Sequence, residues 1–241
     1  MKEAYVMKAR IKFSKSDTMK FIGHLDIMRY FQKAFRRAGI DMAYSQGFSP
    51  HQLISVASPL GVGLTSDGEY MDIVLNQCDD EQTMLDKINA QMVDGIKVSK
   101  FLRLSDDSKN AMSIVAAADY RVSFREGMEL SADVLDGMDG FYKQTRIEIL
   151  KKTKKSEKIV DIKPMIYQFC VNNGHIFMQL ASGSAVNLKP ELVMEAFYKY
   201  AGLEFDPYAL LIHRLELYGD ADPREGFRHL VALDVYGTEL R

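Results

Sequence analysis

Three ionisable side chains are of the types that acid–base catalysis uses. His24 and Asp26 stand two positions apart in the run "FIGHLDIMRYFQKAFRRAG", and His51 follows in the run "YSQGFSPH". An imidazole can exchange a proton near neutral pH, and a nearby carboxylate can hold one tautomer of its ring. His24, Asp26 and His51 are therefore candidate catalytic residues. The alternative is that Asp26 favours the start of a helix and that both histidines are structural.

Four basic side chains follow His24 at spacings typical of one helical face. Arg29, Lys33 and Arg37 stand four positions apart, and Arg36 lies beside them. No acidic residue occurs between positions 27 and 40, whereas a salt-bridged, solvated helix face normally mixes charges of both signs. The pattern favours a surface that contacts phosphate groups, with an ordinary solvated face as the alternative.

The segment "YSQGFSPH" joins an aromatic side chain to polar ones in a constrained turn. Gly47 and Pro50 fix the backbone course, and Phe48 stands directly before Ser49. We interpret Tyr44, Gly47, Phe48 and Ser49 as candidate substrate-binding residues. The alternative is a structured loop whose phenylalanine fills the core.

A second basic segment lies far along the chain. The run "KKTKKSEK", residues 151–158, holds five lysines within eight positions, between two strand-like stretches. It predicts a projecting basic hairpin, which either contacts a nucleic-acid backbone or only increases solubility.

Composition limits the possible cofactors and partners. The 241-residue chain has a formal net charge of -2, so any basic surface must be local. Cys78 and Cys170 are its only cysteines and stand far apart, so we expect no metal site, iron–sulfur cluster or other cofactor in this chain. We find no signal-peptide pattern and no apolar run long enough to span a membrane, and we expect a reduced, cytoplasmic protein with no membrane partner.

The elements that must position these residues follow a repeated order. Alternating residues from Tyr5 to Phe13 predict a strand, and a helix follows with a proposed apolar stripe that ends before Gly39. That stripe consists of Leu25, Met28, Phe31, Phe35 and Ala38. Two strands, a helix and a strand come next, and a similar series recurs after the polar segment 105–113.

The order β-α-β-β-α-β, read twice, predicts the fold class. We expect an α+β protein built from two tandem ferredoxin-like units with antiparallel sheets, an N-terminal unit over residues 1–110 and a C-terminal unit over residues 111–241. Such a scaffold does not by itself select a function.

The dense motif "RIKFSKSDTMKFIGHLDIMRYFQKAFRRAGIDMAYSQGFSPHQLISVASPLGVGLTSDGEYMDI" resembles the DUF2344 family, also described as radical-SAM-linked proteins. The similarity is closest from Arg10 to Asp72 and continues more loosely through most of the chain. Members of that family are encoded beside, or fused to, a radical S-adenosylmethionine (SAM) protein. The resemblance therefore implies a radical SAM protein as partner, with S-adenosylmethionine and an iron–sulfur cluster on that partner only.

These observations lead to one expected function and two alternatives. We expect an accessory protein of a radical SAM enzyme that binds RNA or another anionic substrate, in RNA modification or ribosome-related metabolism. One alternative is a stand-alone enzyme that modifies or cleaves RNA with His24, Asp26 and His51. The other is a protein-binding adaptor that contacts no nucleic acid.

Overall fold

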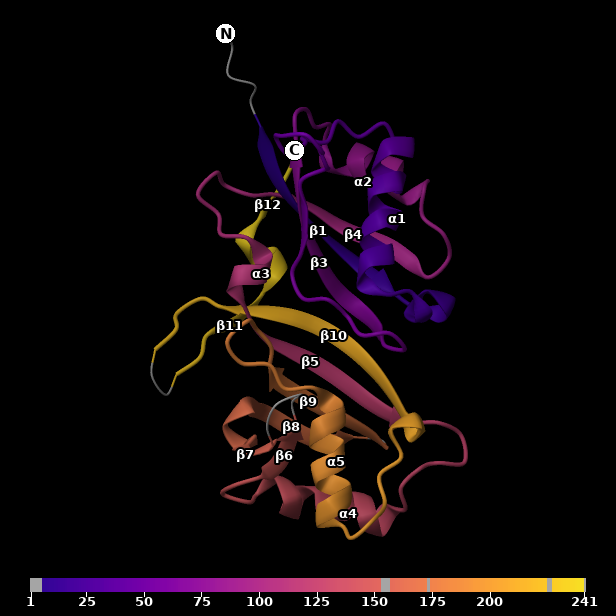
Figure 1. Cartoon of the computed structure of the whole chain (residues 1–241), viewed down its shortest axis with the longest axis vertical. Coiled ribbons are helices and arrows are strands. Elements are labelled where there is room, and N and C mark those ends of the chain that lie inside the picture. The colour runs from indigo at the N-terminus through magenta and orange to yellow at the C-terminus, as the bar shows by residue number, and fades with distance from the viewer. Residues whose placement is uncertain (1–5, 153–156, 173, 225–226, 241) are drawn as a thin grey trace. The chain divides into compact units, whose positions relative to one another are not determined.

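The computed structural model describes residues 6–152, 157–172, 174–224 and 227–240. Over these residues the protein is an α+β fold with five α-helices, ten strands in one sheet and two strands in a separate hairpin (Figure 1). The chain forms two compact units. Unit 1 comprises residues 1–116 together with 216–241, and unit 2 comprises residues 117–215.

Unit 1 has the predicted order of elements in its N-terminal part. They are β1 (Met7–Lys15), α1 (His24–Arg37), β2 (Ile54–Val56), β3 (Thr65–Leu75), α2 (Glu81–Asn89) and β4 (Ile96–Arg103), with the short helix α3 (Ala111–Ile114) after them. Strand β1 pairs with β3 and β4, and β2 pairs with β3, all antiparallel, which gives the order β4-β1-β3-β2. Both α1 and α2 therefore connect strands that are not sheet neighbours.

Helix α1 packs its apolar side on the sheet of unit 1. Its buried residues are Ile27, Phe31, Ala34 and Phe35, and Phe31 makes an edge-on ring contact with Phe13 of β1. Leu25, which the sequence placed in the buried stripe, is instead 68% exposed. The buried stripe begins at Ile27. Leu25 stands two positions earlier, about 200° around the helix from Ile27 at 3.6 residues per turn, so it lies on the opposite side of α1.

The C-terminal segment covers part of the opposite face of this sheet, where Arg10 of β1 donates to the Leu233 carbonyl. Strand β12 (Thr238–Glu239) pairs with β4, and β11 (Leu230–Ala232) pairs with the end of β10. Between them, the 3-10 turn η4 (Leu233–Tyr236) buries Leu233. Residues 216–241 therefore belong to unit 1, which differs from a division into 1–110 and 111–241.

Unit 2 repeats the strand order of unit 1 with an inserted hairpin. Its elements are β5 (Val115–Phe124), α4 (Ala132–Tyr142), the hairpin β6 (Glu148–Lys152) and β7 (Glu157–Asp161), β8 (Ile166–Asn172), β9 (His175–Ala181), α5 (Pro190–Tyr200) and β10 (Leu210–Asp220). Its strand order is β10-β5-β9-β8. Among the helices described, none is long and apolar enough to cross a membrane.

Candidate functional site

The two predicted motif segments attach to opposite ends of β3. The segment before α1 lies at the start of β3, where the Gly63 N–H donates to the Lys20 carbonyl over 2.7 Å. The segment with His51 lies at the other end, where the Ala43 N–H donates to the Val74 carbonyl over 2.8 Å. Strand β3 has 11 residues and spans about 33 Å. The structure therefore does not bring His24 and Asp26 together with His51.

The basic residues of α1 are exposed, as a phosphate-contacting surface requires. We call Arg29, Lys33, Arg36 and Arg37 the α1 basic face. Arg29 forms an exposed ion pair with Asp26 at 3.2 Å. The Arg37 guanidinium donates to both the side-chain oxygen and the backbone carbonyl of Gln91. These bonds connect α1 to the segment after α2.

The loop from Tyr44 to His51 is held in shape by its own polar groups. The His51 N–H donates to the Ser45 hydroxyl oxygen over 3.1 Å, and this hydroxyl lies 2.8 Å from His51 Nδ1. Tyr44 and Gln52 form an antiparallel bridge at the base of the loop. Because Ser45 accepts from the backbone and faces the imidazole, this pair closes the loop.

Phe48 does not fill the core. It is fully exposed to solvent at the tip of this loop, and Tyr44 is partly exposed. The interpretation of the loop as a core plug was therefore wrong. Gly47 adopts φ +109°, which favours glycine, so the turn that presents Phe48 depends on a residue without a side chain.

The C-terminal end of α1 and the Tyr44–His51 loop lie at the same end of unit 1. Only Ala38 to Ala43 separate them, and Met42 bridges to Leu75 at the end of β3. Of the predicted site residues, the structure thus brings Arg36, Arg37 and the loop to one end and leaves His24, Asp26 and Arg29 at the other. The chemical roles assigned to them stay predictions.

A buried ion pair on the opposite sheet face was not predicted from the sequence. Arg10 of β1 is fully buried. Its Nε donates to Asp72 Oδ1 over 2.7 Å, its Nη2 to Asp72 Oδ2 over 3.0 Å, and its Nη1 to the Leu233 carbonyl over 2.9 Å. Asp72 also accepts from the Ala111 N–H over 2.7 Å. This pair joins two strands, the α3 segment and η4.

A second polar cluster on the same face involves the C-terminal segment. The Lys12 ammonium lies 2.5 Å from Glu216, and the Tyr70 hydroxyl donates to the other Glu216 oxygen over 2.7 Å. Lys100 donates to Asp234 over 2.7 Å. Burial raises the pKa of Tyr70 strongly, and the charge of Glu216 adds to this, so Tyr70 stays a hydrogen-bond donor. Burial raises the pKa of Asp234 but Lys100 and Lys12 together hold it below its usual range.

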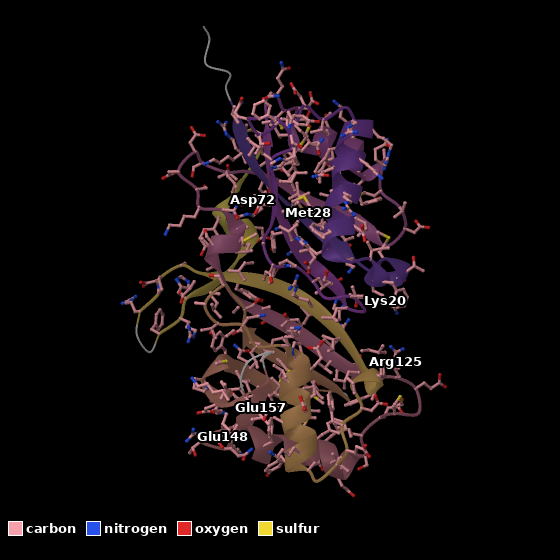
Figure 2. All side chains as sticks on the ribbon, in the orientation of Figure 1. Lys20, Met28, Asp72, Arg125, Glu148 and Glu157 are labelled. Atoms are coloured by element: carbon pink, nitrogen blue, oxygen red, sulfur yellow. The ribbon has the colours of Figure 1, made fainter. Side chains whose placement is uncertain are left out.

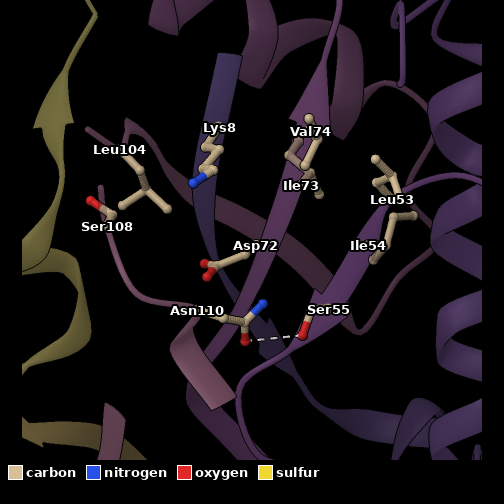
Figure 3. A pocket seen from close by; sticks show the side chains of 10 residues that line it. All are labelled: Lys8, Leu53, Ile54, Ser55, Asp72, Ile73, Val74, Leu104, Ser108 and Asn110. Carbon is tan, nitrogen blue, oxygen red and sulfur yellow. Dashed lines mark hydrogen bonds between the residues drawn. The ribbon is translucent and has the colours of Figure 1, made fainter. Parts of the chain in front are cut away.

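A pocket of about 380 Å³ in unit 1 has Asp72, the acidic member of the buried ion pair, in its lining (Figure 3). Half of its lining is aliphatic and comes from Leu53, Ile54, Ile73, Val74 and Leu104. The other half is polar and comes from Lys8, Ser55, Asp72, Ser108 and Asn110. Because Leu53 follows His51 by two positions, the pocket lies next to the base of the Tyr44–His51 loop.

The basic segment of unit 2 is part of a hairpin, as its strand-like flanks predicted. In the β6–β7 backbone register Lys151 is paired with Lys158 and Lys152 with Glu157. Figure 2 labels Glu148 and Glu157, one on each strand of this hairpin. Residues 153–156 lie outside the described part of the chain. Leu150 and Ile159, which face each other in the register, are both exposed.

Histidine, cysteine and acidic side chains are the groups with which this chain could hold a metal ion. Within the ranges that the structure describes, no group of three or more histidine, cysteine or acidic side chains is placed to hold a metal ion. Cys78 and Cys170 are free thiols. Burial, with the charges of Asp79 and Asp80, raises the pKa of the Cys78 thiol to about 11, which makes Cys78 a poor nucleophile at neutral pH.

Comparison with known proteins identifies the family. The family model described as "Uncharacterized protein conserved in bacteria (DUF2344)" matches residues 8–190. That range includes α1, the Tyr44–His51 loop, the Arg10–Asp72 pair and all of the pocket lining. No curated protein matches the chain. The match covers more than half of the sequence, and the chain therefore belongs to the DUF2344 family of uncharacterized bacterial proteins.

Proposed function

We propose that this protein is a non-catalytic accessory protein that binds single-stranded RNA through unit 1 and acts with a radical SAM protein. The observation that carries the RNA proposal is the exposed Phe48 ring on a loop closed by the Ser45–His51 contacts. An aromatic side chain exposed to solvent lacks the favourable free energy of removing its apolar surface from water. A nucleic-acid base that stacks on the ring removes part of this surface from water and supplies that free energy. Such stacking is possible with every base, because each base has a π-face.

The charge distribution supports an anionic partner at the same end of unit 1. The exposed residues Arg36 and Arg37 end α1, and Lys33 lies one turn earlier. The whole chain is slightly acidic, so these cations form a local rather than a general attraction. Phosphate groups could lie along the α1 basic face while a base contacts Phe48.

We also propose that both units are ferredoxin-like. The order of elements in unit 1 and the strand order β4-β1-β3-β2 support this assignment. In unit 2 the strand order β10-β5-β9-β8 has the same pattern once the β6–β7 hairpin is set aside. In unit 1, η4 covers part of the sheet face that an isolated unit of this kind would expose, so RNA would contact the α1 side and the loop instead.

A fluorescence anisotropy titration with a labelled single-stranded RNA tests the RNA proposal. With four cations engaged, log K should fall against log salt with a slope of about -3, taking roughly 0.7 per phosphate. The double variant Lys33→Glu/Arg36→Glu should flatten this slope, whereas Lys189→Glu/Lys199→Glu, an equal charge change at exposed positions around α5, should not. Binding that is absent at low salt, or equally strong in both variants, would reject the proposal.

A second surface favours a protein partner. Phe21, Leu25 and Val62 lie around the start of α1 and are each more than 60% exposed. The Gly63–Lys20 hydrogen bond and the approach of Val62 to Gly23 bring these segments together. We propose that the radical SAM protein, which would carry the cluster and S-adenosylmethionine, docks here.

Co-purification tests the docking proposal. Tagged wild-type protein should retain a radical SAM protein identified by mass spectrometry and by iron–sulfur absorbance. The variant Leu25→Glu should lose it, and Lys199→Glu should not. Retention of the same protein by Leu25→Glu would exclude this surface as the docking site.

The enzyme alternative has less support. Acid–base catalysis on one phosphodiester would need His24 and His51 within reach of the same group. Their positions at opposite ends of β3 do not support such a mechanism.

A further inference from the structure

We infer that the pocket between β1, β2, β3 and the α3 segment binds the imide edge of a uracil base. Three polar side chains carry this inference: Lys8, Asp72 and Asn110, which line one pocket. Figure 3 shows them in the order Lys8, Asp72, Asn110 along one side, with Leu53, Ile54 and Val74 opposite.

The strand register explains why these three groups are neighbours. Lys8 and Arg10 project from the same face of β1, and Arg10 stands opposite Asp72 on β3. Lys8 is therefore the diagonal neighbour of Asp72, at the distance where long side chains reach each other. Asn110 is adjacent because the N–H of the next residue donates to Asp72 Oδ2 over 2.7 Å.

Counting hydrogen bonds shows what each group can still offer a ligand. An ionised carboxylate accepts about four hydrogen bonds, and Asp72 already accepts two from Arg10 and one from the backbone of the α3 segment. One acceptor site is left, on Oδ1. One N–H of the Lys8 ammonium donates a hydrogen bond to the Asp106 carbonyl. The other two N–H groups remain available to donate to a ligand.

The orientation of the Asn110 amide is fixed by its neighbours. Its Oδ1 accepts from the Met112 N–H over 2.9 Å and from the Ser55 hydroxyl over 3.2 Å. A backbone N–H can only donate, so the atom facing Met112 must be the oxygen. The amide nitrogen is then left with two protons to donate towards the pocket (Figure 3).

The pocket side thus presents donor, acceptor, donor in sequence. The complementary ligand edge is acceptor, donor, acceptor. Uracil has this edge, with two carbonyl oxygens on either side of the N3–H. Cytosine presents donor, acceptor, acceptor, and guanine presents acceptor, donor, donor, so each would place at least one like pair against the protein. The aliphatic side chains of Leu53, Ile54 and Val74 suit the flat, weakly polar faces of the base.

The inference rests on the proposed function only for the source of the base, which can be a residue of RNA or a free nucleoside. The edge preference is measured with nucleosides alone. Ligand-observed NMR should show uridine binding roughly tenfold or more tightly than cytidine and than N3-methyluridine, in which the central donor is replaced by a methyl group.

Two variants and a control locate this preference. Lys8→Met removes one donor. Asn110→Asp removes the other but keeps the oxygen that accepts from Met112 and Ser55, and circular dichroism checks that each variant is folded. Each of the two variants alone should abolish the preference for uridine. The control Lys97→Met, which changes an exposed lysine outside the pocket, should keep this preference. Equal binding of the three nucleosides, no uridine binding, or a preference that survives both variants would overturn the inference.

An oligonucleotide arm separates this inference from the proposed function. If octauridylate binds more tightly than octacytidylate and Asn110→Asp removes the difference, the base belongs to RNA. If uridine is preferred but octauridylate binds no more tightly than the nucleoside and is insensitive to salt, the pocket inference holds and the proposed RNA function fails.

Discussion

Removing the Asp72 carboxylate should destabilise unit 1 more than the loss of any exposed ion pair. Arg10 is fully buried, and the change Asp72→Ala would take away its two carboxylate hydrogen bonds of 2.7 and 3.0 Å. It would also leave the Ala111 N–H without its acceptor. Breaking a buried ion pair from one side costs about 3–5 kcal/mol, because the remaining charge stays in the interior.

Urea unfolding followed by far-ultraviolet circular dichroism measures this loss. With a slope of about 2 kcal/mol per molar, the unfolding midpoint of unit 1 should fall by roughly 2 M. The matched control is Asp26→Ala, whose partner Arg29 is 69% exposed. Such pairs contribute at most about 1 kcal/mol. The double change Arg10→Met/Asp72→Leu should recover much of the loss. A loss from Asp72→Ala no larger than that of Asp26→Ala would refute the structural role of the buried pair.

Three further changes have defined outcomes. Burial raises the pKa of Asp234, but Lys100 and Lys12 together outweigh it and lower the pKa in the folded protein. The stability that this carboxylate adds is therefore complete above about pH 4 and is lost as the pH falls through the lowered folded-state pKa. The difference in urea midpoint between wild type and Asp234→Asn should therefore shrink as the pH is lowered from 7 to 3. Gly95→Ala should lower the unfolding midpoint more than Gly127→Ala, since both have positive φ but only at Gly95 would the new Cβ meet a backbone oxygen, at 2.7 Å. Phe48→Ala should leave the unfolding midpoint unchanged because the ring is exposed, yet weaken RNA binding roughly 5- to 150-fold through the loss of one stacked base.

The local elements of unit 1 could be predicted because they follow from periodic patterns. The alternation in β1 predicted a strand, and the spacing in α1 predicted a helix that ends before Gly39. The residue at which the buried stripe begins does not follow from the pattern, since Leu25 and Ile27 are both apolar and only the packing of α1 on the sheet selects Ile27.

Long-range features could not be derived in the same way. Arg10 and Asp72 are 62 positions apart, and their pairing depends on the β1–β3 register, which no local pattern specifies. The return of residues 216–241 to unit 1 is seen in long-range contacts, the β12–β4 pairing and the Lys100–Asp234 ion pair, which no local pattern specifies. The exposure of Phe48 was also open, because a phenylalanine beside glycine and proline suits a buried plug as well as a presented ring.

Photochemical cross-linking of the whole chain to a single-stranded RNA, with the adducts located by mass spectrometry, tests the central claim most directly. The proposed RNA-binding role of unit 1 predicts adducts on the peptide that contains Tyr44 and Phe48, and their loss in the Lys33→Glu/Arg36→Glu variant. Adducts confined to unit 2, or a Phe48 peptide that never cross-links while others do, would contradict it.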